Sequence, residues 1–351
     1  MMLHTRSPLA NSSFRSGVHC WAVMISLEQV REAQQRIQGV AVRTPLLRYY
    51  PPSGDHAHHG TEQLYLKPES MQPIGSFKLR GAYNKIASLA PEERARGVIT
   101  YSSGNHAQGV AYAARALRAK SVIVMPRNAP KVKRMATEAL GAEIVEVGAG
   151  SDERMRKAQE LAAEHGYVII PPYDDEHIIA GQGTIGVEIL EDLRDVGLVL
   201  VPVGGGGLSS GVAAAVKLSG SAAKVIGVEP ALANDAQQSL SEGRIVQIAP
   251  ERAASTLADG LRTQSIGVRN FEHLSRFMDD IVTVSEDQIR AAMRCMMTSA
   301  RLIAEPSGAV TFAAWLFLRE RLPASGKTVA IISGGNAEPK LLAEVLAQTT
   351  A

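Results

Sequence analysis

The chain has 351 residues, of which 45% are hydrophobic and 21% are charged. This balance is typical of a globular protein and excludes disordered, collagen-like and coiled-coil classes. The 37 Lys and Arg residues against 35 Asp and Glu residues leave a formal charge of +2, which argues against a nucleic-acid-binding protein.

The cysteine content and the first residues of the chain both point to a cytoplasmic protein. Cys20 and Cys295 are too few for a disulfide framework. Residues 1–23 contain no apolar stretch long enough for a secretory signal, so we expect a disordered extension with the fold beginning at Met24. The longest uncharged window, residues 196–216, contains six glycines. It therefore predicts a buried strand, a turn and a helix, and no membrane span.

Three histidines cluster in the least regular part of the sequence. His56, His58 and His59 lie within residues 51–63 and could bind a metal ion. No Cys or second His pair follows at ligand spacing, so an exposed loop is the favoured interpretation.

Short apolar runs alternate with helical periodicity along the rest of the chain. Ser102 and Ser103 offer N-cap oxygens to a helix after the first of these runs, and Gly141 closes the helix after the second. Alternating strands and helices predict βαβ units, a parallel sheet and an α/β fold class. The predicted strands are residues 98–101, 122–125, 144–147, 198–203, 225–229 and 329–332, and one predicted helix is residues 131–140.

Four consecutive glycines, Gly204 to Gly207, lie between a predicted strand and a predicted helix. Unpaired backbone N–H groups at a helix N-terminus bind phosphate. No register gives the glycine spacing of a dinucleotide fingerprint. Glu229 could still serve as the acid that binds a ribose, so a nicotinamide-dependent dehydrogenase remains an alternative, and a packing turn without a ligand is another.

Three further glycine-bearing turns follow predicted strands or begin predicted helices, where α/β folds place their ligands. They are Gly-Ser-Phe-Lys at 75–78, Ser-Ser-Gly-Asn-His at 102–106 and Ser-Gly-Gly-Asn at 333–336. Taken alone, Lys78 is expected to be solvated and His106 to be an ordinary residue of a helix start.

The four turns together, in this order, resemble the fold-type-II pyridoxal-phosphate (PLP) enzymes, in their serine/threonine dehydratase and serine racemase branch. The resemblance runs from about Ile25 to the C-terminus. It implies two open, twisted, mostly parallel sheets flanked by helices, as in the β subunit of tryptophan synthase.

The resemblance also implies a role for each matching residue. Lys78 carries PLP as a Schiff base, and Phe77 flanks the ring. Asn105 binds the 3-oxygen of the ring and Ser333 faces its nitrogen. The residues that hold the phosphate are Gly204, Gly205, Gly206, Gly207 and Leu208.

By the same resemblance, Lys78 also removes the Cα proton of the substrate as general base. The substrate carboxylate binds the turn made of Ser102, Ser103, Gly104, Asn105 and His106. Racemases of the family have serine at the position of Ser103, as the base on the opposite face of the cofactor. Ser103 as a plain helix cap is the alternative.

Glu229, Ala233 and Asp235 match the family's divalent-cation site. Two carboxylates and a backbone carbonyl suit Mg²⁺, or Ca²⁺ or Mn²⁺, better than zinc. Solvated acids are the alternative. Glu305 matches a family position near the cofactor, with its role left open.

The family's architecture implies a large PLP-binding domain, residues 24–94 and 173–351, and a small mobile domain, residues 95–172. A homodimer is usual in the family. No regulatory domain is expected after the strand that precedes Ser333.

The sequence therefore predicts a PLP-dependent ammonia-lyase that converts L-threonine, L-serine or a related 3-hydroxy amino acid to a 2-oxo acid and ammonia. Serine racemase and 3-hydroxyaspartate ammonia-lyase are close alternatives. A nicotinamide dehydrogenase and a non-catalytic metabolite-binding module come from other classes.

Overall fold

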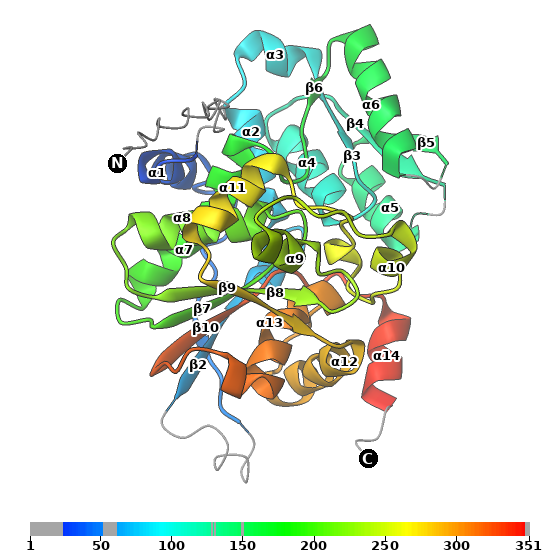
Figure 1. Ribbon diagram of the computed structural model, residues 1–351. Helices are drawn as coiled ribbons and strands as arrows, with labels where there is room; N and C mark the ends of the chain where they lie inside the picture. The colour runs from blue at the N-terminus through cyan, green and yellow to red at the C-terminus, as the bar shows by residue number, and fades with distance from the viewer. Residues whose placement is uncertain (1–23, 52–61, 128, 130, 149–150, 348–351) are drawn as a thin grey trace, which may run out of the picture.

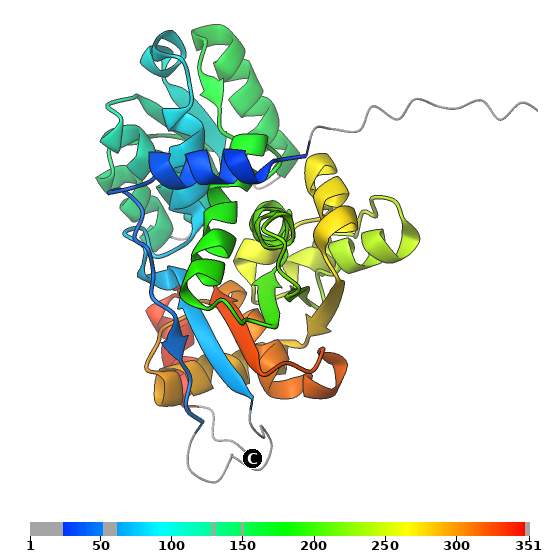
Figure 2. The same ribbon diagram turned by 90° about the vertical axis from the view of Figure 1, so that its left-hand side faces the viewer.

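The computed structural model describes residues 24–51, 62–127, 129, 131–148 and 151–347. The described strands form two separate sheets with helices around both, one above the other in Figure 1 and Figure 2. The predicted α/β class with two mostly parallel sheets is confirmed. The expected extension at residues 1–23 and the histidines at 56, 58 and 59 lie outside the described residues.

The larger sheet has six strands in the order β1-β2-β10-β7-β8-β9. Every neighbouring pair is parallel except β1 with β2. The strands are β1 (Leu47–Arg48), β2 (Gln63–Pro68), β7 (Leu198–Pro202), β8 (Lys224–Pro230), β9 (Asp280–Val284) and β10 (Lys327–Ile332).

This sheet is buried on both faces because its central strands are continuously apolar, and successive side chains point to opposite faces. Leu198 and Leu200 of β7 join the core under α12 (Glu286–Cys295) and α13 (Pro306–Phe317). Val199 and Val201 join the core under α7 (Glu176–Asp192) and α8 (Gly207–Leu218). In Figure 1 these helix pairs lie on opposite sides of the sheet.

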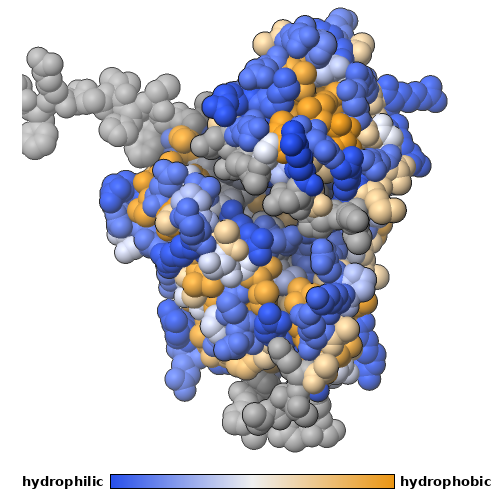
Figure 3. Space-filling model, turned by 90° about the vertical axis from the view of Figure 1, so that its right-hand side faces the viewer, coloured by the Kyte–Doolittle hydropathy of each residue, from blue (hydrophilic) through white to orange (hydrophobic). Residues whose placement is uncertain are grey.

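The smaller sheet has four parallel strands in the order β5-β4-β3-β6, all drawn from residues 98–169. Its strands are β3 (Val98–Tyr101), β4 (Ser121–Pro126), β5 (Glu143–Val147) and β6 (Val168–Ile169). On the face seen in Figure 3, the largest apolar area of the surface lies on this upper, four-stranded part.

The remaining helices connect these strands or cover the sheets. They are α1 (Leu27–Arg36), α2 (Lys78–Ala87), α3 (Pro91–Arg96), α4 (Asn105–Ala116), α5 (Lys131–Ala139), α6 (Ser151–His165), α9 (Asp235–Glu242), α10 (Pro250–Ala254), α11 (Val268–Phe277) and α14 (Pro339–Ala347). No helix within the described ranges is both long and apolar enough to cross a membrane.

Four helices around the candidate site pack in successive pairs. Helix α7 packs on both α2 and α8, and α2 packs on α4. A Cβ atom on Gly181 of α7 would lie 2.6 Å from the Cα of Gly81 in α2. Glycines therefore set the distance between α7 and α2.

One local prediction is wrong. Helix α4 begins at Asn105 with Gly104 as its N-cap and no side-chain cap. The hydroxyl of Ser102 instead accepts a hydrogen bond from the N–H of Gly104 at 3.3 Å. The serines lie too far before the helix to cap it, because the intervening residues form a turn of their own. The predicted closure of α5 near Gly141, with φ +88°, is confirmed.

Candidate active site

Lys78 is the first residue of α2, after a turn in which Gly75 has φ +71°. Its Nζ donates a hydrogen bond to the carbonyl oxygen of Pro172 at 2.7 Å and lies 5.3 Å from the ring centre of Phe77. Burial of the amine lowers the pKa of Lys78 to about 8. The fraction of this amine that is neutral and nucleophilic near neutral pH is therefore much larger than for an exposed lysine.

The four-glycine turn connects β7 to α8 and is buried along its length. Gly206, with φ +97°, is the N-cap of α8. Within the described part of the chain, no acceptor is recorded for the backbone N–H groups of Gly205, Gly206, Gly207 and Leu208. These buried donors at the start of a twelve-residue helix suit a phosphate group.

Side chains are absent from this turn for a steric reason as well. A Cβ atom on Gly205 would clash with the ring of Tyr173, and one on Gly207 would lie 3.0 Å from the Cα of Tyr173. The segment at residues 170–173 therefore lies directly against the glycine turn.

Backbone hydrogen bonds join the turn at 75–78 to the turn at 333–336. The N–H of Phe77 donates to the carbonyl oxygen of Ser333 at 3.1 Å, and the N–H of Gly335 donates to that of Gly75 at 2.9 Å. Ser333 is 4% exposed, and its hydroxyl donates to the carbonyl oxygen of Ser307 at 3.3 Å.

Asn105 connects the turn at 102–106 to the same cluster. Its Nδ2 donates to Oε1 of Glu305 at 2.5 Å, and its Oδ1 accepts from Nδ2 of Asn336 at 2.8 Å. Ser102, Ser103 and Gly104 stay partly exposed beside it. The structure thus brings together all four turns that were singled out in the sequence.

Glu305 is a buried acid within this cluster. Its Oε2 has no hydrogen-bond partner among the described residues. Burial, and then the charge of Asp259, raises the pKa of Glu305 to about 7. Asp259 itself pairs with Lys133 of α5.

Glu229, near the end of β8, and Asp235, the first residue of α9, lie close together. Glu229 accepts hydrogen bonds from the N–H groups of Ala236 at 3.1 Å and Gln237 at 2.8 Å. Burial and the charge of Asp235 raise the pKa of Glu229, and burial raises that of Asp235 to about 7. Oδ2 of Asp235 is buried and has no partner within the described ranges.

Glu229 and Asp235 are a pair of acids and fall short of a complete set of metal ligands by themselves. Of the described residues, no three His, Cys, Asp or Glu side chains form a metal-binding group. A cation there would need backbone oxygens in addition to the two carboxylates, and the carbonyl of the buried Ala233 is the candidate.

Sequence reasoning missed the segment at residues 170–173. Pro172 and Tyr173 contact the amine of Lys78 and the glycine turn, respectively. The Pro172 contact uses a backbone carbonyl, which a side-chain pattern does not reveal. The two consecutive prolines, Pro171 and Pro172, were the available signal.

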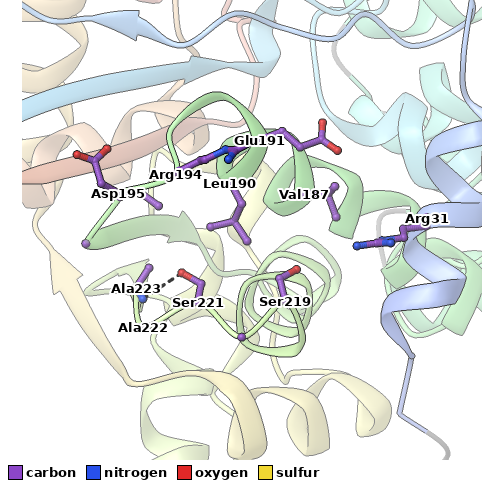
Figure 4. A pocket seen from close by; sticks show the side chains of 13 residues that line it. Arg31, Val187, Leu190, Glu191, Arg194, Asp195, Ser219, Ser221, Ala222 and Ala223 are labelled. Atoms are coloured by element: carbon purple, nitrogen blue, oxygen red, sulfur yellow. Dashed lines mark hydrogen bonds between the residues drawn. The ribbon is translucent and has the colours of Figure 1, made fainter.

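A separate pocket of about 660 Å³ lies away from these residues. Figure 4 shows it between Arg31 of α1, the end of α7 and the turn from Ser219 to Ala223. Its lining residues Gly197 and Ala223 precede β7 and β8, whereas the glycine turn follows β7. The pocket is therefore at the opposite edge of the sheet.

Comparisons with known proteins agree with this geometry. A family model described as pyridoxal-phosphate dependent enzyme matches residues 37–334. An L-threonine ammonia-lyase from Thermotoga maritima is 44% identical over 324 residues, which cover 92% of this chain and 78% of that protein. An L-threo-3-hydroxyaspartate ammonia-lyase from Saccharomyces cerevisiae is 40% identical over 318 residues, covering 90% of this chain and 95% of that protein. Among solved structures, a serine racemase from maize has a TM-score of 0.86 at 34% identity and covers 92% of this chain and 97% of its own.

Proposed function

The chain belongs to the family of pyridoxal-phosphate-dependent enzymes, and from this premise we propose that it is an ammonia-lyase acting on 3-hydroxy amino acids. L-threonine or L-serine is the proposed substrate, and a 2-oxo acid and ammonia are the products. The family and fold that the sequence resembles are confirmed, and nothing in the match supports a nicotinamide dehydrogenase. The names of relatives at 40–44% identity support the reaction.

One observation carries the proposal: a buried amine of lowered pKa lies where all four glycine-bearing turns meet. Lys78 would bind the cofactor covalently, and the unpaired N–H groups of the glycine turn would hold its phosphate. Asn105 would bind its 3-oxygen and Ser333 would face its nitrogen. When bound, the cofactor supplies the electron sink that stabilises negative charge at the substrate's Cα.

Residues of the chain then remove the substrate's proton, bind its carboxylate and favour elimination. The amine of Lys78 takes the proton from Cα, which its pKa of about 8 permits near neutral pH. The turn at residues 102–106 opens the N-terminus of α4 and binds the substrate carboxylate. The neutral hydroxyl of Ser333 stabilises a protonated ring nitrogen less than a carboxylate would, which favours elimination over transamination.

We also propose a divalent cation, Mg²⁺ or Ca²⁺ or Mn²⁺, held by Glu229, Asp235 and the carbonyl of Ala233. The unpaired, buried Oδ2 of Asp235 and the raised pKa values of both acids support it. A cation would remove the electrostatic cost of ionising two neighbouring buried carboxylates.

Racemisation of serine is the second candidate function. Ser103 lies in the partly exposed turn at the start of α4, and the maize neighbour is a serine racemase. If both activities are present, Ser103→Ala should abolish formation of D-serine and retain elimination of L-serine.

Three further statements from the sequence stay proposals. The large domain is residues 24–94 and 173–351, and the small mobile domain is residues 95–172. Confinement of the four-stranded sheet to residues 98–169 supports this division. We also propose that the protein is a homodimer and that it is located in the cytoplasm.

A substrate screen tests the proposed function. Purified, PLP-loaded protein is given L- and D-serine, L-threonine, phenylserine and 3-hydroxyaspartate, with Mg²⁺ or after chelator treatment. We expect equal amounts of ammonia and 2-oxo acid from a 3-hydroxy amino acid, with higher rates when the cation is present. Lys78→Ala should lose both the activity and the Schiff-base absorbance band. Full activity of Lys78→Ala, or no ammonia from any substrate, would refute the proposal.

A further inference from the structure

His106 lies in the first turn of α4 and is 3% exposed. Its Nε2 is 3.0 Å from the carbonyl oxygen of Ile170. A carbonyl oxygen can only accept, so Nε2 carries the proton and Nδ1 is an acceptor. Nδ1 is buried and has no partner in the described part of the chain. An ordinary core histidine would satisfy both nitrogens.

The face of α4 that carries His106 packs on the start of α2. Gly109 lies three residues after His106 and so on the same face of the helix. A Cβ atom on Gly109 would lie 3.1 Å from the carbonyl oxygen of Lys78 and 3.4 Å from its Cβ. His106 is therefore a neighbour of Lys78 across this helix contact.

The side chains of His106 and Lys78 also form hydrogen bonds with the same short stretch of backbone. His106 binds the carbonyl of Ile170, and Lys78 binds that of Pro172 at 2.7 Å. Each of these two contacts is made with a residue of the segment at 170–172, whose ends are about 7 Å apart when extended. Burial and the charge of Lys78 lower the pKa of His106 to about 3, so its ring is neutral at working pH.

We propose that His106 is a positioning residue for Lys78, acting through the segment at residues 170–172. The Nε2–H of His106 fixes the Ile170 carbonyl, and the Pro172 carbonyl two residues later holds the amine where the cofactor must meet it. This inference rests on the proposed function, in which Lys78 is the residue that binds PLP.

The segment does not depend on His106 for its folding. The hydroxyl of Thr100 also donates to the Ile170 oxygen, at 2.7 Å, and the N–H of Ile170 donates to Ile99 at 2.8 Å. Removing the histidine should therefore leave the segment attached to β3 but no longer to α4, the helix that packs against Lys78.

Three substitutions separate the two ring nitrogens. Gln places a donor near the position of Nε2, Asn places polar atoms near that of Nδ1, and Leu has neither. The measurements are the dissociation constant of PLP, from its Schiff-base absorbance in a titration of cofactor-free protein, and the melting temperature of that protein. Thr100→Val is the matched control, because it removes the bond from β3 to the same oxygen and keeps the bond from α4, the helix that packs on the Lys78 helix.

We expect His106→Gln to bind PLP like the unsubstituted protein. His106→Leu and His106→Asn should bind it about three- to tenfold more weakly, the effect of one hydrogen bond, and Thr100→Val should be less affected. Tight binding by His106→Leu would overturn the inference, and so would weak binding by His106→Gln or an equal loss in Thr100→Val. If His106→Leu does not fold, the Gln and Asn variants decide between the same outcomes.

The experiment also separates this inference from the function on which it rests. If the unsubstituted protein shows no absorbance band that depends on Lys78, the proposed function fails. If the band is present and the His106 variants leave the PLP dissociation constant unchanged, only the role of His106 fails.

Discussion

Lys67 and Lys78 have both lost most of their contact with water, and their hydrogen-bond partners differ. Lys67 is fully buried and pairs with Glu188 at 2.7 Å, so its charge is neutralised within the protein. Lys78 has a carbonyl oxygen as its recorded hydrogen-bond partner, and burial lowers its pKa to about 8. A buried ammonium group held by a neutral acceptor is destabilising, and such groups are typical of reactive sites.

Because burial of the Lys78 ammonium group is destabilising, we predict that its removal stabilises the protein. In cofactor-free protein at pH 7, Lys78→Met should raise the free energy of unfolding by about 1–3 kcal/mol, because it removes the buried charge. The folded-state pKa lies below the unfolded value, so the unfolded chain binds more protons between pH 8 and 10.5. The unsubstituted protein therefore gains stability as pH rises through that window, and its deficit against Lys78→Met should shrink there.

Urea unfolding of both proteins at pH 7 and pH 10 measures this difference. Other lysines and tyrosines titrate equally in the two proteins and cancel. A Lys78→Met protein that is less stable at pH 7, or a difference that does not change with pH, would contradict the assignment of a desolvated amine.

Helix α7 is the element that fixes the others around the site. Gly181 meets α2 and Gly183 meets α8, where a Cβ would lie 2.9 Å from the carbonyl oxygen of Gly211. Helix α2 begins with Lys78, and α8 begins at the glycine turn. Close glycine contacts on both sides of α7 thus hold the proposed Schiff-base lysine and the proposed phosphate site at a fixed separation.

A buried ionic cluster adds to this constraint. Arg80, in the first turn of α2, pairs with Glu69 at 2.8 Å and with Glu188 of α7 at 2.6 Å. All three side chains are at most 5% exposed. Removing one member of such a cluster leaves a buried charge unpaired, which costs about 3–5 kcal/mol. The cluster therefore fixes the register of α2 against α7.

Substitution of a contact glycine tests the role of α7. Gly181→Ala would place a Cβ 2.8 Å from the carbonyl oxygen of Arg80 and 2.6 Å from the Cα of Gly81, so the backbones must move apart. We expect a loss of about 1–3 kcal/mol in the free energy of unfolding and weaker binding of PLP. Gly326→Ala is the control, because a Cβ there meets nothing within 4 Å, and it should change stability by less than about 0.5 kcal/mol.

Chemical denaturation and PLP titration of the two variants give the comparison. Equal stability of Gly181→Ala and Gly326→Ala would show that the helix contact tolerates a methyl group. In that case α7 would not set the distance between the proposed lysine and phosphate sites.

At the scale of the whole molecule, the candidate site is built from segments that follow strands of both sheets. Helices α2 and α8 follow β2 and β7 of the six-stranded sheet, and α4 follows β3 of the four-stranded sheet. Asn105 at the start of α4 then bonds to Glu305, which precedes α13 on the larger sheet. The carboxyl ends of strands from both sheets thereby converge, as expected for ligand sites in α/β folds.

The sequence predicted much of this arrangement because period and turn chemistry are local. Apolar runs and glycines located the strands at 98–101, 122–125 and 144–147 and the four turns, and the structure brings the turns together. The cap assigned to Ser102 and Ser103 was wrong, because a local turn displaces the helix start to Asn105. The role of residues 170–173 was missed, since it depends on backbone carbonyls and on contacts across the fold.

The contacts between distant residues are the part that no local pattern could supply. The bond of His106 to Ile170 and that of Lys78 to Pro172 span 64 and 94 residues. Both follow from the packing of α4 and α2 beside the end of β6, which the sequence alone did not place.

The central claim is that the amine of Lys78 forms a covalent bond with the cofactor. Borohydride reduction of freshly purified, PLP-loaded protein, followed by tryptic digestion and mass spectrometry, tests it directly. We expect the pyridoxyl phosphate group on Lys78, in a peptide that continues to Arg80 because the modified lysine resists cleavage. An unmodified Lys78, or a label on Lys67, Lys85 or Lys133 in its place, would contradict the account.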